Sequence, residues 1–299
     1  AVTAALTEPM KRLPVDNQIL ILQALGDRND ASALPAIIEI TKNQDTTLRI
    51  TALKTLGQLG NAAVVPVLFA AALDSQPEVA GAAQAILAGL PEDPQIDTAI
   101  LDRAKTGAAN PTNVRLIAID LVAQRRIIAG NPLLFQIADD PDKSIRIAAL
   151  DTLGKTGETA DLANLVALLI QRKNPEELRA AENAVKAVAG KAPDKTACTA
   201  ALLKALPQAQ PEAACALLRL LRTTGGPDAL QAVRTAAKNT NSQIQETAVR
   251  TLCEWPTADA APDLLQMAQT TPGDTTKIAA LRGYINLIRD PALAAENKM

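Results

Sequence analysis

Histidine is absent from this 299-residue chain, and tryptophan, tyrosine and phenylalanine together supply only 1% of its residues. The lack of histidine excludes Ser-His-Asp and Cys-His nucleophile systems, histidine acid–base chemistry and most catalytic zinc sites. The phosphate-binding patterns GxxxxGK[ST] and GxGxxG are missing as well. Catalysis would have to rest on carboxylates, lysines or cysteines, and we expect no catalytic residue, no cofactor and no metal site.

Other classes of protein are excluded by what is scarce. Three cysteines (Cys198, Cys215 and Cys253) with no CxxC spacing support neither a disulfide framework nor a zinc site. Apolar runs such as residues 64–73 are shorter than the roughly 18 residues of a membrane span. With 30 basic and 32 acidic residues the net charge is -2, so we expect no nucleic-acid partner. The oligomeric state is left open.

What the chain does have is a repeat built from alanine and leucine. The stretch TLRITALKTLGQLG from Thr47 returns as SIRIAALDTLGKTG from Ser144. The residues one and four positions after Ala52 share its helical face, and both are apolar. The equivalent residues are also apolar in most of the other repeats. We call the equivalent positions anchors and place them at Ile21, Ala52, Ala83, Ala118, Ala149, Ala184, Ala216, Ala248 and Ala280. The pattern predicts nine inner helices.

Partner helices lie between the inner helices, and many begin with proline, which is tolerated in a first helical turn. Examples are LPAIIEI from Leu34, VVPVLFAAAL from Val64, NPLLFQIA from Asn131 and APDLLQMA from Ala261. Each repeat is therefore a helical hairpin that covers its apolar face by stacking on the next repeat. Four glycines are predicted to end inner helices: Gly26, Gly57, Gly154 and Gly190.

The order of a proline-containing helix, a short Asp or Asn turn and LRxxALxxLG resembles HEAT repeats, particularly the short bacterial phycocyanobilin-lyase-like subtype. The resemblance spans about Leu6 to Ile288. It implies an all-α fold, an α-solenoid forming a right-handed superhelix of about nine stacked hairpins, with residues 1–299 as a single array. It also implies turn aspartates paired with arginines of the following helix, here Asp45 with Arg49 and Asp142 with Arg146.

A candidate partner-binding surface follows from the helical wheel. The residue two after each anchor points away from the buried face, and in arrays of this kind that column lines the concave surface. Candidate partner-binding residues are Lys54, Asp120, Asp151, Lys186, Arg250 and Arg282. Lys186, Arg250 and Arg282 suggest a basic strip for an acidic partner. Leu218 belongs to the same column and is also expected to be exposed.

Two acidic features suggest chemistry but have simpler explanations. Asp120 and Asp151 lie in adjacent repeats and could form a carboxylate pair. The simpler interpretation is that both are helix residues whose side chains are solvated. DDPDKS, residues 139–144, lacks the glycine and glutamate of a calcium loop, and Asp142 is well placed to cap the helix that follows. Cys215 is expected to lie on the inner face and to be unreactive.

The leading functional prediction is a non-catalytic scaffold that presents a concave helical face to a protein partner or to another domain of its own chain. LRGYINLIRDP near the end resembles the terminal part of HEAT arrays joined, in some bacterial exported proteins, to a 3-keto-disaccharide hydrolase-type domain. That resemblance implies an exported or periplasmic protein, although the compartment is not determined. The final RDPALAAENKM reads as a turn and the opening of another helix, so we expect a fragment of a longer protein.

Two alternatives from other classes remain. A bilin lyase or chaperone would hold a tetrapyrrole in the groove, and a HEAT-like DNA glycosylase would share the fold. The first needs aromatic or basic contacts that the inner column scarcely supplies. The second is opposed by the pI near 5.4.

Overall fold

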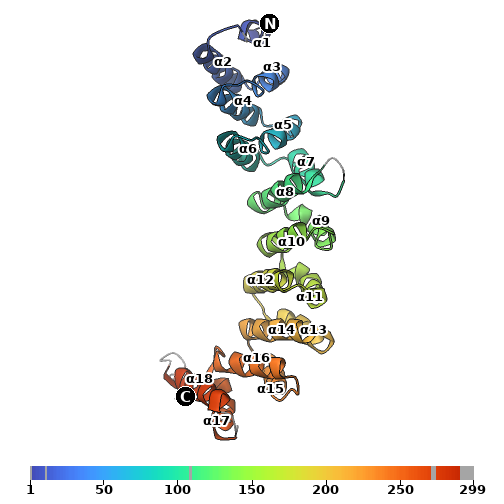
Figure 1. The fold of residues 1–299 in the computed structure, drawn as a ribbon, viewed down its shortest axis with the longest axis vertical. Coiled ribbons are helices and arrows are strands. Elements are labelled where there is room, and N and C mark those ends of the chain that lie inside the picture. The colour runs from blue at the N-terminus through green and yellow to red at the C-terminus, as the bar shows by residue number, and fades with distance from the viewer. Residues whose placement is uncertain (1, 11, 108–109, 271–273, 290–299) are drawn as a thin grey trace. The chain divides into compact units, whose positions relative to one another are not determined.

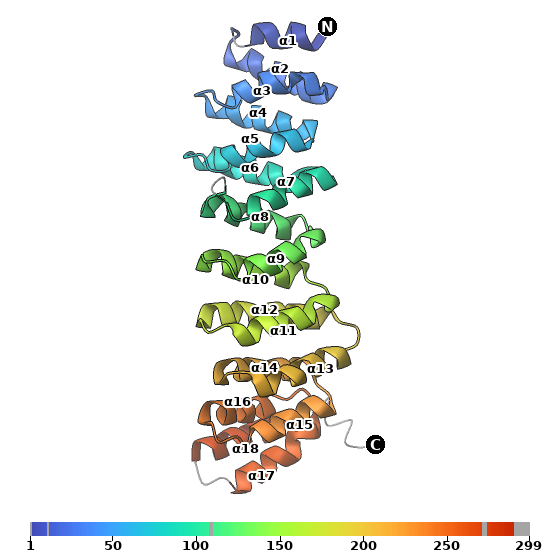
Figure 2. The ribbon, with the colours of Figure 1, turned by 90° about the vertical axis from the view of Figure 1, so that its right-hand side faces the viewer.

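The computed structural model describes residues 2–10, 12–107, 110–270 and 274–289 (Figure 1). Within these residues there are eighteen α-helices, six short 3-10 turns and no strands. The chain divides into two compact units, Ala1–Ala149 and Leu150–Met299. In each unit the even-numbered helices form one column and the odd-numbered helices the other (Figures 1 and 2). The all-α prediction is confirmed.

The helices of the first unit are α1 (Val2–Met10), α2 (Val15–Arg28), α3 (Leu34–Ile40), α4 (Thr46–Leu59), α5 (Val65–Ala71), α6 (Pro77–Gly89), α7 (Pro94–Ala104), α8 (Thr112–Gln124) and α9 (Asn131–Ile137). Helix α10 (Lys143–Thr156) contains the boundary between the units. The second unit continues with α11 (Leu162–Gln171), α12 (Pro175–Lys191), α13 (Thr196–Ala205), α14 (Pro211–Thr224), α15 (Pro227–Ala236), α16 (Ser242–Cys253), α17 (Ala261–Thr270) and α18 (Asp274–Arg289).

The nine predicted anchors all fall in even-numbered helices, which are therefore the inner helices. Pro35, Pro66 and Pro132 occupy the first turns of α3, α5 and α9, as predicted for the partner helices. Each of these three short helices is preceded by a 3-10 turn, which leads the chain from the inner to the outer column. Local sequence thus specifies both halves of the hairpin.

The core consists of successive layers between neighbouring hairpins. In the first unit α2 packs on α4, α4 on α6 and α6 on α8; in the second unit α12 packs on α14, α14 on α16 and α16 on α18. Leucine or valine four residues after the anchor is buried throughout these helices, except that α18 has the half-buried Tyr284 there. Each layer contacts only its neighbours, which is the arrangement of an α-solenoid.

The glycines predicted to end inner helices lie inside them instead. Helix α4 runs past Gly57 to Leu59 and is capped by Gly60, whose φ of 54° is left-handed. A Cβ atom on Gly57 would lie 2.5 Å from Cγ2 of Ile86, and one on Gly154 would lie 3.1 Å from Cα of Ala184. These two glycines therefore allow close approach of the next inner helix. A small residue is needed at this position for packing and not because the helix ends there.

Helix α14 departs from the predicted register by one residue. Leu218, expected to be exposed, has none of its surface exposed, whereas Arg219 is exposed. The structural anchor of α14 is thus Leu217, not Ala216. The sequence ALLRLL has apolar residues on both sides of this choice, so periodicity alone did not separate the two registers.

Candidate functional site

The six predicted partner-binding residues lie on six different inner helices. All six are exposed, and we use the term inner-helix face for this exposed side of the inner helices within each unit. The first unit contributes Lys54 on α4 and Asp120 on α8, and the second contributes Asp151 on α10, Lys186 on α12, Arg250 on α16 and Arg282 on α18. Exposure follows from the helical wheel, because the opposite face of each helix packs in the core.

In the first unit this face carries one charge of each sign, Lys54 and Asp120. Asp120 accepts a hydrogen bond from Gln124 Nε2 at 2.6 Å, one turn further along α8. Lys54 stands on α4, and Ala85 takes the equivalent position on α6. The carboxylate of Asp120 is held by its own helix, as expected of a solvated helix residue.

In the second unit the face is mainly basic. Lys186, Arg250 and Arg282 are exposed, and none forms an ion pair with any residue that the structure describes. Asp151 differs from them, because burial raises the pKa of its carboxyl group while the nearby Lys155 lowers it. The basic character is therefore carried by α12, α16 and α18.

Arg219 of α14 belongs to the same column and was missed by the sequence analysis. Its Nε and Nη2 atoms each donate to a carboxylate oxygen of Glu182 at 2.7 Å, and Glu182 raises the pKa of Arg219. Arg222, one turn along α14, pairs with Glu254, the residue that follows α16. Recognition of Arg219 would have required Leu217 as the anchor, a choice that only the burial of Leu218 reveals.

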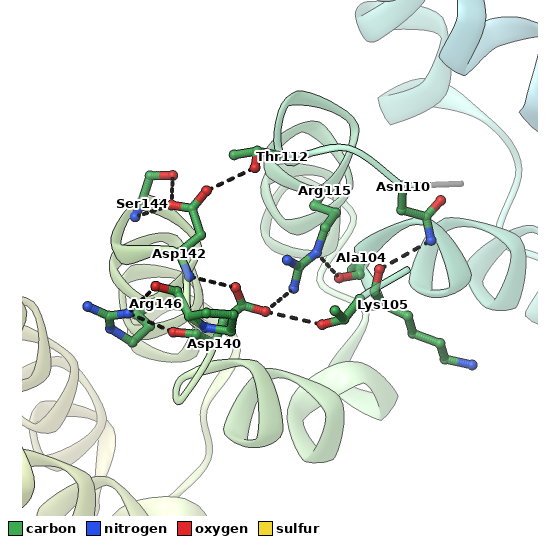
Figure 3. A network of polar contacts seen from close by, with 11 residues as sticks. Ala104, Lys105, Asn110, Thr112, Arg115, Asp140, Asp142, Ser144 and Arg146 are labelled. Carbon is green, nitrogen blue, oxygen red and sulfur yellow. Dashed lines mark hydrogen bonds and ion pairs between the residues drawn. The ribbon is translucent and has the colours of Figure 1, made fainter. Parts of the chain in front are cut away.

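A buried ion pair connects two hairpins of the first unit (Figure 3). Arg115 Nη2 of α8 lies 2.5 Å from Asp140 Oδ2, in the turn before α10, and the side chains are only 6% and 2% exposed. Arg115 Nε donates to the carbonyl oxygen of Ala104 at 3.0 Å. The Arg115 guanidinium holds the pKa of Asp140 below its usual value, although burial opposes it.

Arg49 of α4 and Asp74 repeat this arrangement. In both pairs the aspartate follows the arginine by 25 residues and belongs to the next hairpin. In both, the other carboxylate oxygen accepts the backbone N–H two residues later, at 2.9 Å. These two inter-hairpin pairs join neighbouring repeats by a charged contact at the turn.

The prediction that Asp45 pairs with Arg49, and Asp142 with Arg146, is therefore wrong. Asp45 accepts the backbone N–H of Leu48 at 2.8 Å and caps α4. Asp142 accepts from Thr112 Oγ1 at 2.9 Å and from the Ser144 backbone at 2.8 Å, which confirms its predicted role as a cap. The Ser144 hydroxyl, which donates to Asp142 Oδ1 at 2.6 Å, lowers the pKa of Asp142 to about 2 together with these two bonds. Arg146 Nη1 donates instead to the carbonyl oxygens of Asp140 and Pro141 (Figure 3).

Comparison with known families agrees with this arrangement. Three stretches, residues 3–88, 99–186 and 199–284, match the family described as HEAT repeats. The chain belongs to the HEAT repeat family. No curated protein is similar enough in sequence to count as a relative.

Comparison with solved structures finds similar chains at low sequence identity. A chain from the complex of Kap95p with RanGDP is 12% identical with a TM-score of 0.52, over 98% of this chain and 45% of that one. Human deoxyhypusine hydroxylase in complex with glycerol is 16% identical with a TM-score of 0.34, over 88% and 98%. The CpcE–CpcF complex of phycocyanin lyase from Nostoc sp. PCC7120 is 18% identical with a TM-score of 0.32, over 88% and 92%. At 12% identity, the likeness to the chain from the Kap95p complex shows the fold and nothing more.

Reactive groups do not converge in the part of these HEAT repeats that the structure describes. No three His, Cys, Asp or Glu side chains there are grouped to hold a metal ion. Burial raises the pKa of the Cys198 and Cys253 thiols, which disfavours the nucleophilic thiolate. Cys215, expected on the exposed face, is 3% exposed. None of the described helices is long and apolar enough to cross a membrane.

Proposed function

We propose that this chain is a non-catalytic scaffold, a single array over residues 1–299, that holds a protein partner or another domain of its own polypeptide on the inner-helix face. HEAT-repeat membership supports a protein-interaction scaffold fold. The observation that carries the more specific proposal is the basic strip of the second unit, made of Lys186, Arg250 and Arg282, which favours an acidic partner segment.

The electrostatics of the strip distinguish it from ordinary surface charge. The two arginines of α14 are neutralised by Glu182 and Glu254. Lys186, Arg250 and Arg282, in contrast, form no ion pair within the described residues. Unpaired cations repeated at one helical position attract and orient an acidic segment, because complementary charge accelerates encounter and sets register.

The tetrapyrrole and base-excision alternatives are less well supported. Both call for aromatic side chains that stack on a flat ligand. The four aromatic residues of the chain are buried or half-buried: Phe69, Phe135, Trp255 and Tyr284. A binding face of exposed methylenes and charges suits a polypeptide better than it suits a planar ring.

The test uses a fluorescein-labelled oligoglutamate peptide as the probe and fluorescence anisotropy as the readout. At about 50 mM salt we expect the triple variant K186E/R250E/R282E to bind at least about tenfold more weakly than the unaltered chain. The matched control K173E/K204E/K238E makes the same change in charge at exposed residues of outer helices and turns. We expect it to retain affinity within about threefold.

Equal loss of binding in the two triple variants would show attraction to net charge alone and would contradict a localised strip. So would retention of affinity by K186E/R250E/R282E. Circular dichroism of each variant checks that its helix content is unchanged.

A further inference from the structure

The last described helix, α18, exposes three large aliphatic side chains on one face. Ile278, Leu281 and Ile285 are 48%, 39% and 42% exposed. They are separated by three and four residues, a spacing that places side chains next to one another on a helix. We call these three residues the α18 stripe.

The position of Leu281 is buried in the inner helices α12, α14 and α16. Leu281 is the residue after its anchor, Ala280. The corresponding residue is Val185 in α12, Leu218 in the corrected register of α14, and Val249 in α16. Their exposed fractions are 0%, 0% and 8%. The exposure of Leu281 is therefore not a property of its place in the repeat. It reflects the lack, among the described residues, of a helix on that side.

In the preceding layers this side of an inner helix receives the next inner helix. Cys253 of α16 lies five residues after its anchor, as Ile285 does in α18. A Cβ atom on Gly283 of α18 would lie 2.8 Å from Cys253 Cα, so the two backbones are in close contact there. Cys253 Sγ also lies 3.4 Å from the carbonyl oxygen of Ala279. Through Ile285, the α18 stripe thus includes the same position on α18 that α16 uses to contact α18.

We infer that the α18 stripe is covered by a tenth helical hairpin of the same polypeptide. The expected opening of that hairpin, residues 290–295, lies outside the described residues. Its sequence DPALAA is similar to GPDALQA, with which α15 begins at residues 226–232. A proline-led start directly after α18 identifies the occupant as a further repeat, independently of what the inner-helix face binds.

The stripe also specifies the chemistry of the incoming helix. Between α4 and α6, Gly57 lies five residues after its anchor and contacts Ile86, which lies three after its own. Between α16 and α18 the two positions hold Cys253 and Gly283. In both of these pairs one member is glycine, which leaves room for the other side chain. Because α18 has Ile285 at this position, the tenth inner helix should have glycine, alanine or serine three residues after its anchor.

The experiment compares the polypeptide as its gene encodes it beyond Met299 with residues 1–299 alone. Backbone hydrogen exchange of α18 should be slower by about tenfold or more in the encoded polypeptide, because a covered helix opens less often. The double variant L281E/I285E should remove this difference. The control L265E alters an exposed leucine of α17, so it should leave the difference intact.

Equal exchange of α18 in the two polypeptides, or a reading frame that stops within a few residues of Met299, would overturn the inference. A dimer of residues 1–299 that L281E/I285E converts to monomer would assign the stripe to a second copy, and this would overturn it as well. Both Leu281 and Ile285 are exposed in the 1–299 chain, so their substitution should not prevent its folding.

Discussion

At the residue scale, the Arg115–Asp140 pair is a buried charge contact within the first unit. Both side chains are withdrawn from water, and the arginine is further held by the Ala104 carbonyl oxygen. A buried charge is tolerated only when its partner and hydrogen bonds replace the lost hydration. The contact therefore ties the turn before α10 to α8, and its effect on stability depends on both partners being present.

We predict that Asp140→Asn lowers the free energy of unfolding by about 3–5 kcal/mol, because it leaves Arg115 buried without a compensating charge. Denaturant unfolding measures the change. Asp102→Asn is the control: Asp102 and Lys105 pair on the surface, each side chain 56% exposed, and such pairs contribute less than about 1 kcal/mol. Similar losses in the two variants would mean that the burial of the pair has no energetic consequence.

At the element scale, α14 is the most enclosed inner helix among those described. Six consecutive residues, Ala213–Leu218, are buried, so the helix contacts neighbours on more than one side. Apolar residues on several sides blur the helical period from which the register is read. The consequence is the one-residue offset that turns Arg219 toward solvent and Leu218 into the core.

We predict that Leu218→Ala destabilises the protein by about 2–5 kcal/mol, because it leaves a cavity between packed helices. Arg219→Ala should cost less than about 1 kcal/mol, since it removes an ion pair whose arginine is 47% exposed. Thermal or denaturant unfolding of the two single variants gives the comparison. The opposite order of stabilities would restore the register anchored on Ala216.

At the scale of the whole molecule, charge is nearly balanced, with 30 basic and 32 acidic residues. The basic strip is therefore a local feature and does not create a general positive field. Local charge of this kind selects a partner by its pattern of acidic groups, whereas nucleic acid binding usually draws on an extended positive surface.

We predict that the chain is not retained on immobilised double-stranded DNA at about 0.15 M salt, because few phosphates could be neutralised at once. The fraction recovered in the flow-through is the measurement, and K186E/R250E/R282E should behave in the same way as the unaltered chain. Retention that this variant abolishes would instead assign the basic strip to nucleic acid.

The amino-acid sequence alone determined the hairpins, because helix periodicity, proline at helix starts and a recurring small residue are local signals. It likewise placed the six candidate residues on the exposed sides of inner helices, although their role as a binding face remains a proposal. Tertiary structure decided which arginine meets which aspartate, the register of α14, the packing role of Gly57 and Gly154, and the exposure of the α18 stripe. Each of these depends on the neighbour that a side chain meets across a layer, and residues about 25 or more positions apart carry no local signal of that contact.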